Sequence, residues 1–558
     1  MSSSDGSSAS TSSCSSASIP TSSGQRPSLS PSPGCQDWAV HPERALGEPA
    51  ALRAAPPRGS TPVPGTFTLI ENPSTQYFDG GAVLLGGSPL RLFRVSARGQ
   101  RLLARWRSGG AVGESRAAQL LARRLVASGT FAPRPAKAGF GRNDVTVVVP
   151  VRDRPAQLDR LLRALGDLDC IVVDDASSDT GVIKEIAERH GARFAGLTIN
   201  RGPAGARNAG MALVAHALVA FVDSDCVPRA GWLEPLLGHF DDPVVGAVAP
   251  RVVPANSSTS GVLQRYAAVR SSLDRGPNEG PVRPGSPIPY VPSAALVVRA
   301  DVVAGTDLFD PTLWGGEDVD LVWRLVDAGW DVRYVPSSTV EHDGPATLGS
   351  FLARRAFYGS TAGPLALRHP EAMAPVHVSA WSLAVWLLAL ARRPVLAWAT
   401  LAASITILAN RLQKLVRDPV AVASRIAGGG TVRSALPALS GVARTWSPAL
   451  LLGLLSRRTR RAAALTLVVP ALRDWATDRE TLDPLRYVAL HVADDAAYGA
   501  GVWMGSARSR TFVPLLPRVS WRSRVWSPEA LRQGLDGRRG GPRKPAWREG
   551  RFAKPART

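Results

Sequence analysis

The segment Val145-Thr-Val-Val-Val-Pro150 and the segment from Pro155 to Leu165 that follows it indicate the class of fold. The first is a β-branched apolar run of the kind that forms a buried strand. In the second, leucines recur at i, i+3, i+4 and i+7 from Leu158, which is the spacing of an amphipathic helix. A buried strand followed by such a helix is the first half of a βαβ unit, so we expect an α/β domain.

The same pattern repeats downstream. We expect further strands at residues 170–175, 193–198 and 217–222, and helices at 183–190 and 204–218. This alternation predicts a parallel sheet with helices on both faces, whose ligands bind at the carboxyl ends of the strands. Three polar clusters lie at those ends: Arg152-Asp153, Asp174-Asp175, and Asp223 with Asp225.

Size and composition restrict the class of protein. A chain of 558 residues with 45% hydrophobic residues predicts several domains and at least one large core. The net charge of +21 predicts attraction to anionic lipid, nucleic acid or phosphorylated substrates. The four cysteines show no disulfide or zinc spacing, which favours a reducing compartment. The start Met1-Ser-Ser-Ser-Asp does not resemble a secretory signal.

Shifts in composition predict five regions. Residues 1–64 are a Ser/Pro-rich tail that we expect to be disordered, and 65–136 form a small winged-helix-like α+β module ending in a linker from Phe131. The α/β domain covers 143–360, an apolar helical region covers 361–515, and a basic tail covers 516–558.

The apolar runs 378–391 and 395–409 are shorter than the roughly 20 residues of a membrane span. Core helices, interfacial hairpins and transmembrane helices therefore all stay open for this region. Trp and flanking Arg residues favour association with a membrane.

Two of the strand-end clusters have both a functional and an ordinary interpretation. Asp223 and Asp225 would suit Mg²⁺ or Mn²⁺ and a substrate diphosphate, but Asp-Ser-Asp is also a common loop opening. Asp174 or Asp175 would accept hydrogen bonds from a uracil or a ribose. In the ordinary interpretation this segment caps the next helix through Ser177, Ser178 or Asp179.

Three later positions carry similar alternatives. Arg207 and Asn208 would point from the first helical turns toward a nucleotide, unless the small residues around them serve only packing. In Glu317-Asp318-Val-Asp320, acidic residues suit a helix N-terminus, but one of them would also deprotonate a sugar hydroxyl. His342 follows a predicted strand and would be structural or a metal ligand.

The order of these motifs resembles the family 2 glycosyltransferases of the Rossmann-like GT-A fold, over residues 143–345. The resemblance implies an inverting transferase that uses a nucleotide-diphosphate sugar. The roles it implies are uridine binding by Asp175 with Asp153 and Asp174, nucleotide binding by Arg207, and binding of ribose, diphosphate and metal by Asp223 and Asp225. His342 would complete the metal site, and Asp318 would be the general base, with Glu317 as the alternative.

The whole arrangement is similar to the glycosyltransferases of the mycofactocin system, which carry a PqqD-like peptide-recognition module in front. That resemblance implies transfer of β-linked glucose from UDP-glucose to a peptide-derived redox cofactor. The Gln-x-x-Arg-Trp motif of processive synthases is not present near Phe351-Leu-Ala-Arg354-Arg355, so we expect a short glucan chain.

Two alternatives remain: a cell-envelope lipid or polysaccharide as acceptor, and a non-catalytic protein that binds a sugar nucleotide or a peptide. A nucleic-acid partner is disfavoured, because the arginines concentrate around apolar segments and in the tail. We expect the protein at the cell membrane, with its catalytic domain on the cytoplasmic side.

Overall fold

The computed structural model describes residues 52–57, 59–136, 138–255, 261–303, 308–345, 347–477 and 482–520. The predicted disordered tail lies outside the described residues as far as residue 51, and so does the predicted basic tail beyond residue 520. Residues 52–57 pack on the α/β core, where the indole N–H of Trp330 donates to the carbonyl of Arg53 at 2.7 Å.

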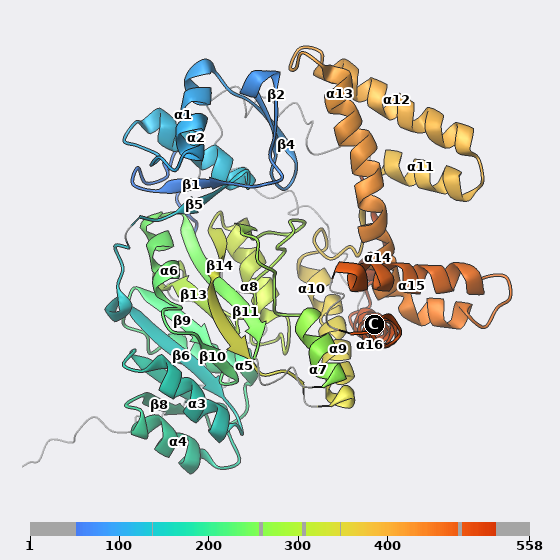
Figure 1. Cartoon of the computed structure of the whole chain (residues 1–558). Helices are drawn as coiled ribbons and strands as arrows, with labels where there is room; N and C mark the ends of the chain where they lie inside the picture. Colours follow the sequence, from blue (N-terminus) through green and yellow to red (C-terminus); the bar gives the residue numbers. More distant parts are fainter. Residues whose placement is uncertain are drawn as a thin grey trace, which may run out of the picture. The chain divides into compact units, whose positions relative to one another are not determined.

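One mixed sheet carries the α/β domain (Figure 1), in the order β10-β14-β11-β13-β9-β6-β7-β8, with β12 beside β14. Its strands are β6 (Val145–Val151), β7 (Cys170–Asp174), β8 (Arg193–Gly196), β9 (Leu218–Val222), β10 (Cys226–Pro228), β11 (Val245–Pro254), β12 (Gly280–Pro281), β13 (Ala295–Arg299) and β14 (Asp331–His342). The helices of this domain are α3 (Pro155–Leu165), α4 (Thr180–Arg189), α5 (Gly202–Met211), α6 (Glu234–Leu237), α7 (Val262–Val269) and α8 (Glu317–Asp327).

Both faces of the sheet are buried, as the alternation along β6 requires. Val147 and Val149 belong to the core cluster that contains the leucines of α3, whereas Val148 belongs to the cluster with Ala206 of α5 and Leu321 of α8. The predicted helices on both faces are therefore present.

The sheet is not parallel throughout. Strands β6, β7, β8 and β9 are parallel as predicted, but β13 runs antiparallel to both β9 and β11. The chain leaves β11 at its carboxyl end and enters β13 at that same edge, so β13 must run in the opposite direction. As a result, the ends of β6, β7, β9 and β14 and the start of β13 all meet at one edge, where the predicted site residues lie.

The segment before the sheet is a small α+β region with its own core, which contains Phe67, Trp106 and Leu125. Its elements are β1 (Thr68–Glu71), β2 (Gln76–Phe78), β3 (Val83–Gly86), β4 (Arg91–Arg94), α1 (Ala97–Arg107), α2 (Arg116–Ser128) and β5 (Phe131–Arg134). The predicted linker begins instead with β5, which pairs with β1 because Phe131 is buried there.

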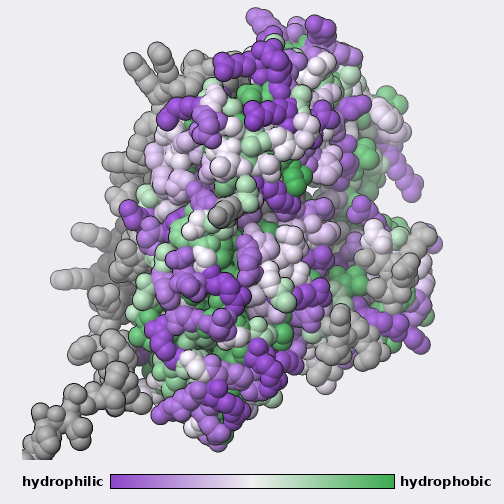
Figure 2. Space-filling view, turned by 60° about the vertical axis from the view of Figure 1, so that its left-hand side comes forward, coloured by the Kyte–Doolittle hydropathy of each residue, from purple (hydrophilic) through white to green (hydrophobic). Residues whose placement is uncertain are grey.

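The C-terminal region is mainly helical. Its elements are α9 (Leu348–Ser360), α10 (Ala362–Arg368), β15 (His377–Ser379), α11 (Ala380–Leu390), α12 (Pro394–Leu412), α13 (Pro419–Ala423), α14 (Gly429–Gly453), α15 (Arg460–Thr477), α16 (Pro484–Arg508) and β16 (Arg518–Ser520). Among the described residues, α12 alone is long and apolar enough to cross a membrane, with 19 residues and a mean hydropathy of 1.5. On the face drawn in Figure 2, hydrophilic and hydrophobic side chains are interspersed.

Asp320 ties the sheet domain to the C-terminal helices. Its side chain has no solvent exposure, and it accepts hydrogen bonds from Arg324 Nε at 2.6 Å, His369 Nε2 at 2.9 Å and Arg368 Nη1 at 3.2 Å. Burial acts to raise the pKa of Asp320, but these cationic neighbours outweigh it and lower the pKa to about 2. The third acidic residue of the Glu-Asp-Val-Asp motif is therefore a structural ion-pair partner.

We predict that Asp320→Asn lowers the free energy of unfolding by about 3–5 kcal/mol, because it removes a buried anion that the half-buried Arg324 and Arg368 pair with. Urea unfolding at neutral pH measures this loss. Since the folded pKa lies below the unfolded one, the contribution of Asp320 is present above pH 4 and is lost as the pH falls toward about 2. The difference in the free energy of unfolding between wild type and variant should therefore shrink as the pH falls over that range. Asp327→Asn, at the exposed end of the same helix, is the control and should be near neutral; equal stability of all three proteins at pH 7 would contradict the assignment.

Candidate functional site

The two carboxylates after β9 have different partners. Asp223 and Asp225 lie in a tight turn closed by a hydrogen bond from the Cys226 N–H to the Asp223 carbonyl at 2.9 Å. Asp223 Oδ1 accepts from Arg207 Nη2 at 2.5 Å, whereas Asp225 pairs with Arg154. The turn thus separates two carboxylates that an extended backbone would direct to one side.

Asp225 lies beside His342 because β10 pairs with the end of β14, with Cys226 opposite His342. The distance from His342 Nε2 to Asp225 Oδ1 is 3.6 Å. Burial acts to raise the pKa of the Asp225 carboxyl, but His342, Arg154 and Arg354 hold it below its usual value.

A carboxylate oxygen and an imidazole nitrogen at this separation fit a divalent cation that takes its other ligands from phosphate and water, as Mg²⁺ commonly does. The carboxylate of Asp223 pairs with Arg207, as that of Asp225 pairs with Arg154. Within the described ranges, no group of three or more His, Cys, Asp or Glu side chains gathers in a metal-binding arrangement. A cation here would therefore depend on oxygens that a substrate supplies.

Arg207 joins the end of β9 to the start of α8. Its guanidinium is buried, and it donates to Asp223 and, through Nη1 at 2.9 Å, to Glu317 Oε1. Burial acts to lower the pKa of Arg207, but the two carboxylates hold it above its usual value. The Glu317 carboxylate is therefore held in an ion pair with Arg207. The neighbouring Asn208 does not point to a ligand, because its side-chain amide bonds both the N–H and the carbonyl of Phe309.

Asp318 has backbone partners and no direct ion pair among the described residues. Its Oδ1 accepts from the Val319 N–H at 2.8 Å and its Oδ2 from the Ser293 N–H at 3.3 Å. Loss of hydration raises the pKa of Asp318 to about 7; the charge of Glu317 acts in the same direction, and Arg207 opposes it. A carboxyl that titrates near neutral pH suits proton transfer.

Two glycines allow α8 to begin at this point. Gly316 has a φ of +78°, and a Cβ on it would lie 2.9 Å from Leu365 of α10. A Cβ on Gly315 would lie 2.6 Å from Phe357 of α9. The acidic start of α8 thus abuts the first C-terminal helices without side chains between them.

The third cluster joins the loops after β6 and β7. Asp153 Oδ1 accepts from the Ser178 N–H at 2.7 Å, and the Asp153 N–H donates to Ser177 Oγ at 2.9 Å. Asp174 is fully buried and accepts from Ser177 and from Thr180 Oγ1, so it braces the loop after β7. The cap of α4 is Asp179, one of the residues that the sequence offered, and its Oδ1 accepts from the Val182 N–H at 3.1 Å.

Asp175 faces the loop before α5, where its Oδ1 accepts from the Arg201 N–H at 2.7 Å. Burial raises the pKa of Asp175, and the hydrogen bonds from the Arg201 and Gly202 backbone reduce the shift. Asp153, Asp174 and Asp175 thus lie together at the ends of β6 and β7, while Arg207, Asp223, Glu317 and Asp318 form a second group at the end of β9. Asp225 and His342 form a third.

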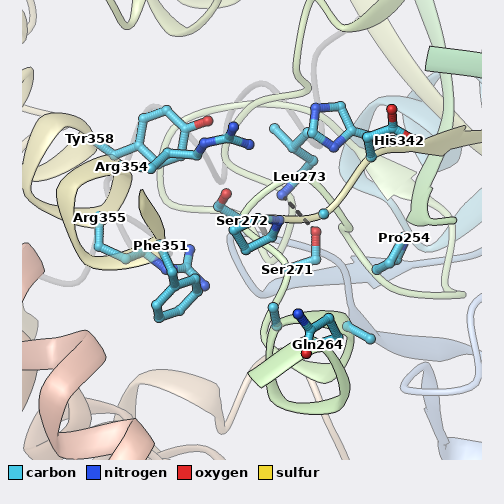
Figure 3. Close-up of a pocket in the computed structure, with 15 residues that line it drawn as sticks. Pro254, Gln264, Ser271, Ser272, Leu273, His342, Phe351, Arg354, Arg355 and Tyr358 are labelled. Carbon is cyan, nitrogen blue, oxygen red and sulfur yellow. Dashed lines mark hydrogen bonds between the residues drawn. The ribbon is translucent and has the colours of Figure 1, made fainter. Parts of the chain in front are cut away.

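A pocket beside His342 contains residues that sequence reasoning missed. Figure 3 shows Arg354 and Tyr358, one turn apart on α9, with the Arg354 side chain extending toward His342. Arg354 has no ion-pair partner among the described residues. Burial raises the pKa of Tyr358, and Asp318 acts in the same direction, which places Tyr358 near that carboxyl. The i, i+4 spacing was the signal in the sequence, but nothing there showed which helix face meets the site.

Similarity to known proteins agrees with this geometry. The profile of glycosyl transferase family 2 matches residues 146–301. The pre-mycofactocin glycosyltransferase of Mycobacterium tuberculosis strain H37Rv is 40% identical over 476 residues, which cover 82% of this chain and 99% of that protein. Glycosyltransferase AglE of Haloferax volcanii is 27% identical over 202 residues, covering 34% of this chain and 64% of the relative.

Among solved structures, the mannosyltransferase PcManGT from Pyrobaculum calidifontis, in complex with GDP-Man and Mn²⁺, is 18% identical. It matches 61% of this chain and 89% of its own with a TM-score of 0.33. The family assignment instead follows from the profile match and from the identity to the mycobacterial protein. The chain belongs to glycosyl transferase family 2, has the GT-A fold, and is a member of the family of pre-mycofactocin glycosyltransferases.

Proposed function

We propose that this protein transfers glucose from UDP-glucose to a peptide-derived redox cofactor during mycofactocin maturation, with inversion, and that it builds a short β-glucan chain. The observation that carries this proposal is the 40% identity over 99% of the mycobacterial relative, which extends well beyond the 146–301 transferase segment. A cell-envelope lipid or polysaccharide acceptor is the alternative, which the exposed apolar helices of the C-terminal region favour.

The donor diphosphate would lie between Asp225–His342 and the arginines Arg154 and Arg354. Asp225 and His342 would hold Mg²⁺ or Mn²⁺, which neutralises charge on a departing diphosphate when it is bound. Arg354 supports this placement because its guanidinium lines the pocket beside His342 and has no carboxylate partner among the described residues.

The nucleoside would lie over the ends of β6, β7 and β9. In this proposal Asp153 and Asp175, on loops braced by Asp174, contact the uridine, and Asp223 contacts the ribose. Arg207 keeps Asp223 in place through their ion pair. Hydrogen bonds to strand-end carboxylates are the usual way in which such sheets hold a nucleoside.

Asp318 would be the general base. Its carboxylate takes the proton of an acceptor hydroxyl while the hydroxyl oxygen bonds to the anomeric carbon and the bond from that carbon to the diphosphate breaks. A single displacement inverts the anomeric centre because no side chain forms a covalent intermediate. The pKa of about 7 supports this role, and the ion pair of Glu317 with Arg207 makes Glu317 the weaker candidate.

The acceptor would be recognised outside the sheet domain. We assign this role to the region 65–136 as a PqqD-like peptide-recognition module, supported by its separate core and its own two sheets. We place the protein at the cell membrane with the catalytic domain on the cytoplasmic side, where nucleotide sugars are made.

We predict that Asp318→Asn lowers the rate of glucose transfer by about 10²–10⁴-fold while UDP affinity stays within about twofold. Mass spectrometry of a peptide-derived acceptor incubated with UDP-glucose measures transfer, and calorimetry measures UDP binding. In the wild type kcat/KM should rise with pH through about 7, because the base must be deprotonated. Asp327→Asn, on the last turn of the same helix, should behave as wild type. Normal turnover in the Asp318 variant would show that Asp318 is not the base. If the wild type transfers no glucose to this acceptor, the proposed acceptor is wrong.

A second prediction concerns Arg354. Arg354→Gln should weaken UDP binding by about tenfold or more and leave UMP binding nearly unchanged, because a charge-assisted contact to the β-phosphate is lost. Calorimetry with both nucleotides in the presence of Mn²⁺ separates the two effects. Arg265→Gln on α7 is the control, since Arg265 is exposed and lies outside the residues that line the pocket. An equal loss of UDP and UMP affinity would show that Arg354 acts on the fold rather than on the diphosphate.

A further inference from the structure

The helices α11 and α14 bury mainly polar side chains and expose apolar ones, whereas α12 buries Ser404 together with apolar residues. Ser382 of α11 and Thr431 of α14 are both buried, and their hydroxyls hydrogen-bond at 2.9 Å. Ser404 of α12 and Ser447 of α14 are buried as well. Ser447 Oγ donates to the Asp495 carbonyl at 2.7 Å. A water-facing helix has the opposite pattern, with its apolar stripe inward.

The outward side chains are large and apolar at two separate turns. Near the turn between α11 and α12, which lie side by side in Figure 1, Leu390 is 80% exposed, Val395 78% and Trp398 71%. Near the turn between α14 and α15, Leu452 is 69% exposed and Leu455 83%. Single exposed apolar residues are ordinary, but groups of this kind mark an interaction surface.

Both turns are also basic. Arg392 and Arg393 lie between α11 and α12, and the second turn carries four exposed arginines, Arg457, Arg458, Arg460 and Arg461. Residues 372–473 contain 13 Lys and Arg residues and a single acidic residue, Asp418. An apolar surface with this charge is complementary to an anionic layer that has an apolar interior.

We infer that the α11–α12 and α14–α15 turns dock on an anionic lipid bilayer and lie in its interface rather than across it. The helix α11 has 11 residues, about half the length of a span. Insertion of the turn tip-first would also place Arg392 and Arg393 in the hydrocarbon region, which is costly. In the interface, the arginines reach headgroup phosphates while Leu390, Val395 and Trp398 enter the acyl boundary. The inference does not depend on the sugar or on the acceptor.

Co-sedimentation of the full-length protein with vesicles tests this docking. Binding should be strong on phosphatidylcholine vesicles that contain phosphatidylglycerol and at least about tenfold weaker on phosphatidylcholine alone. Arg392→Gln with Arg393→Gln should lower the partition coefficient on the anionic vesicles by about tenfold. The triple change of Leu390, Val395 and Trp398 to Ser should lower it by a similar factor.

A matched control distinguishes an effect of these two turns from an effect of the protein's net charge. Arg98→Gln with Arg101→Gln on α1 makes the same change in net charge at exposed positions and should leave binding unchanged. An equal loss of vesicle binding in this control would overturn the inference. Binding that is equally strong with and without phosphatidylglycerol would overturn it as well. Protein that resists extraction from the vesicles by alkaline carbonate would overturn the interfacial placement. A dimer that forms without lipid and is lost in the triple variant would assign the surface to a second copy of the chain instead.

Discussion

The ion pairs of Arg207 hold the site together. The guanidinium donates to Asp223, at the end of β9, and to Glu317, at the start of α8. These two residues are far apart in the chain, and one buried cation fixes the distance between them. Removing Arg207 would leave two carboxylates facing each other in a poorly hydrated place, and their repulsion would shift both the end of β9 and the start of α8.

Arg207 also makes the acidic residues near it differ in charge state and in role. Glu317 and Asp223 are neutralised by Arg207. The adjacent Asp318 accepts from two backbone N–H groups, has no ion pair among the described residues, and has a pKa of about 7. Two residues later, Asp320 is surrounded by cations and has a pKa of about 2. Within one helical turn, the surroundings thus produce an ion-pair partner, a carboxyl able to exchange protons near neutral pH, and a structural anion.

Local patterns in the sequence predicted local structure well. The strand from Val145 and the helix from Pro155 lie where their apolar periodicity placed them. Long-range features were not accessible. Neither the reversed direction of β13 nor the pairing of β5 with β1 has a local signal, because each depends on where a distant segment returns.

The same distinction applies to the site. The order of the motifs identified Asp223, Asp225, Asp318 and His342 as candidates, but it did not show that Arg207 would separate Asp223 from Asp225. Nor did it show that α9 would bring Arg354 and Tyr358 to the site, because that depends on packing against α16. Close helix contact is possible there because Gly359 and Gly501 have no side chains; a Cβ on Gly501 would lie 2.0 Å from the Ala356 carbonyl. The C-terminal helices therefore support the site as well as presenting an apolar surface.

In the proposed reaction a single base, Asp318, promotes one displacement at the anomeric carbon. The anomeric configuration of the product therefore reports on this step. Proton NMR of the glucosylated product made from UDP-glucose, whose glucose is α-linked, should show the large anomeric coupling of a β-linkage. An α-linked product would rule out this reaction, because an in-line displacement on an α-linked donor can give only the β configuration.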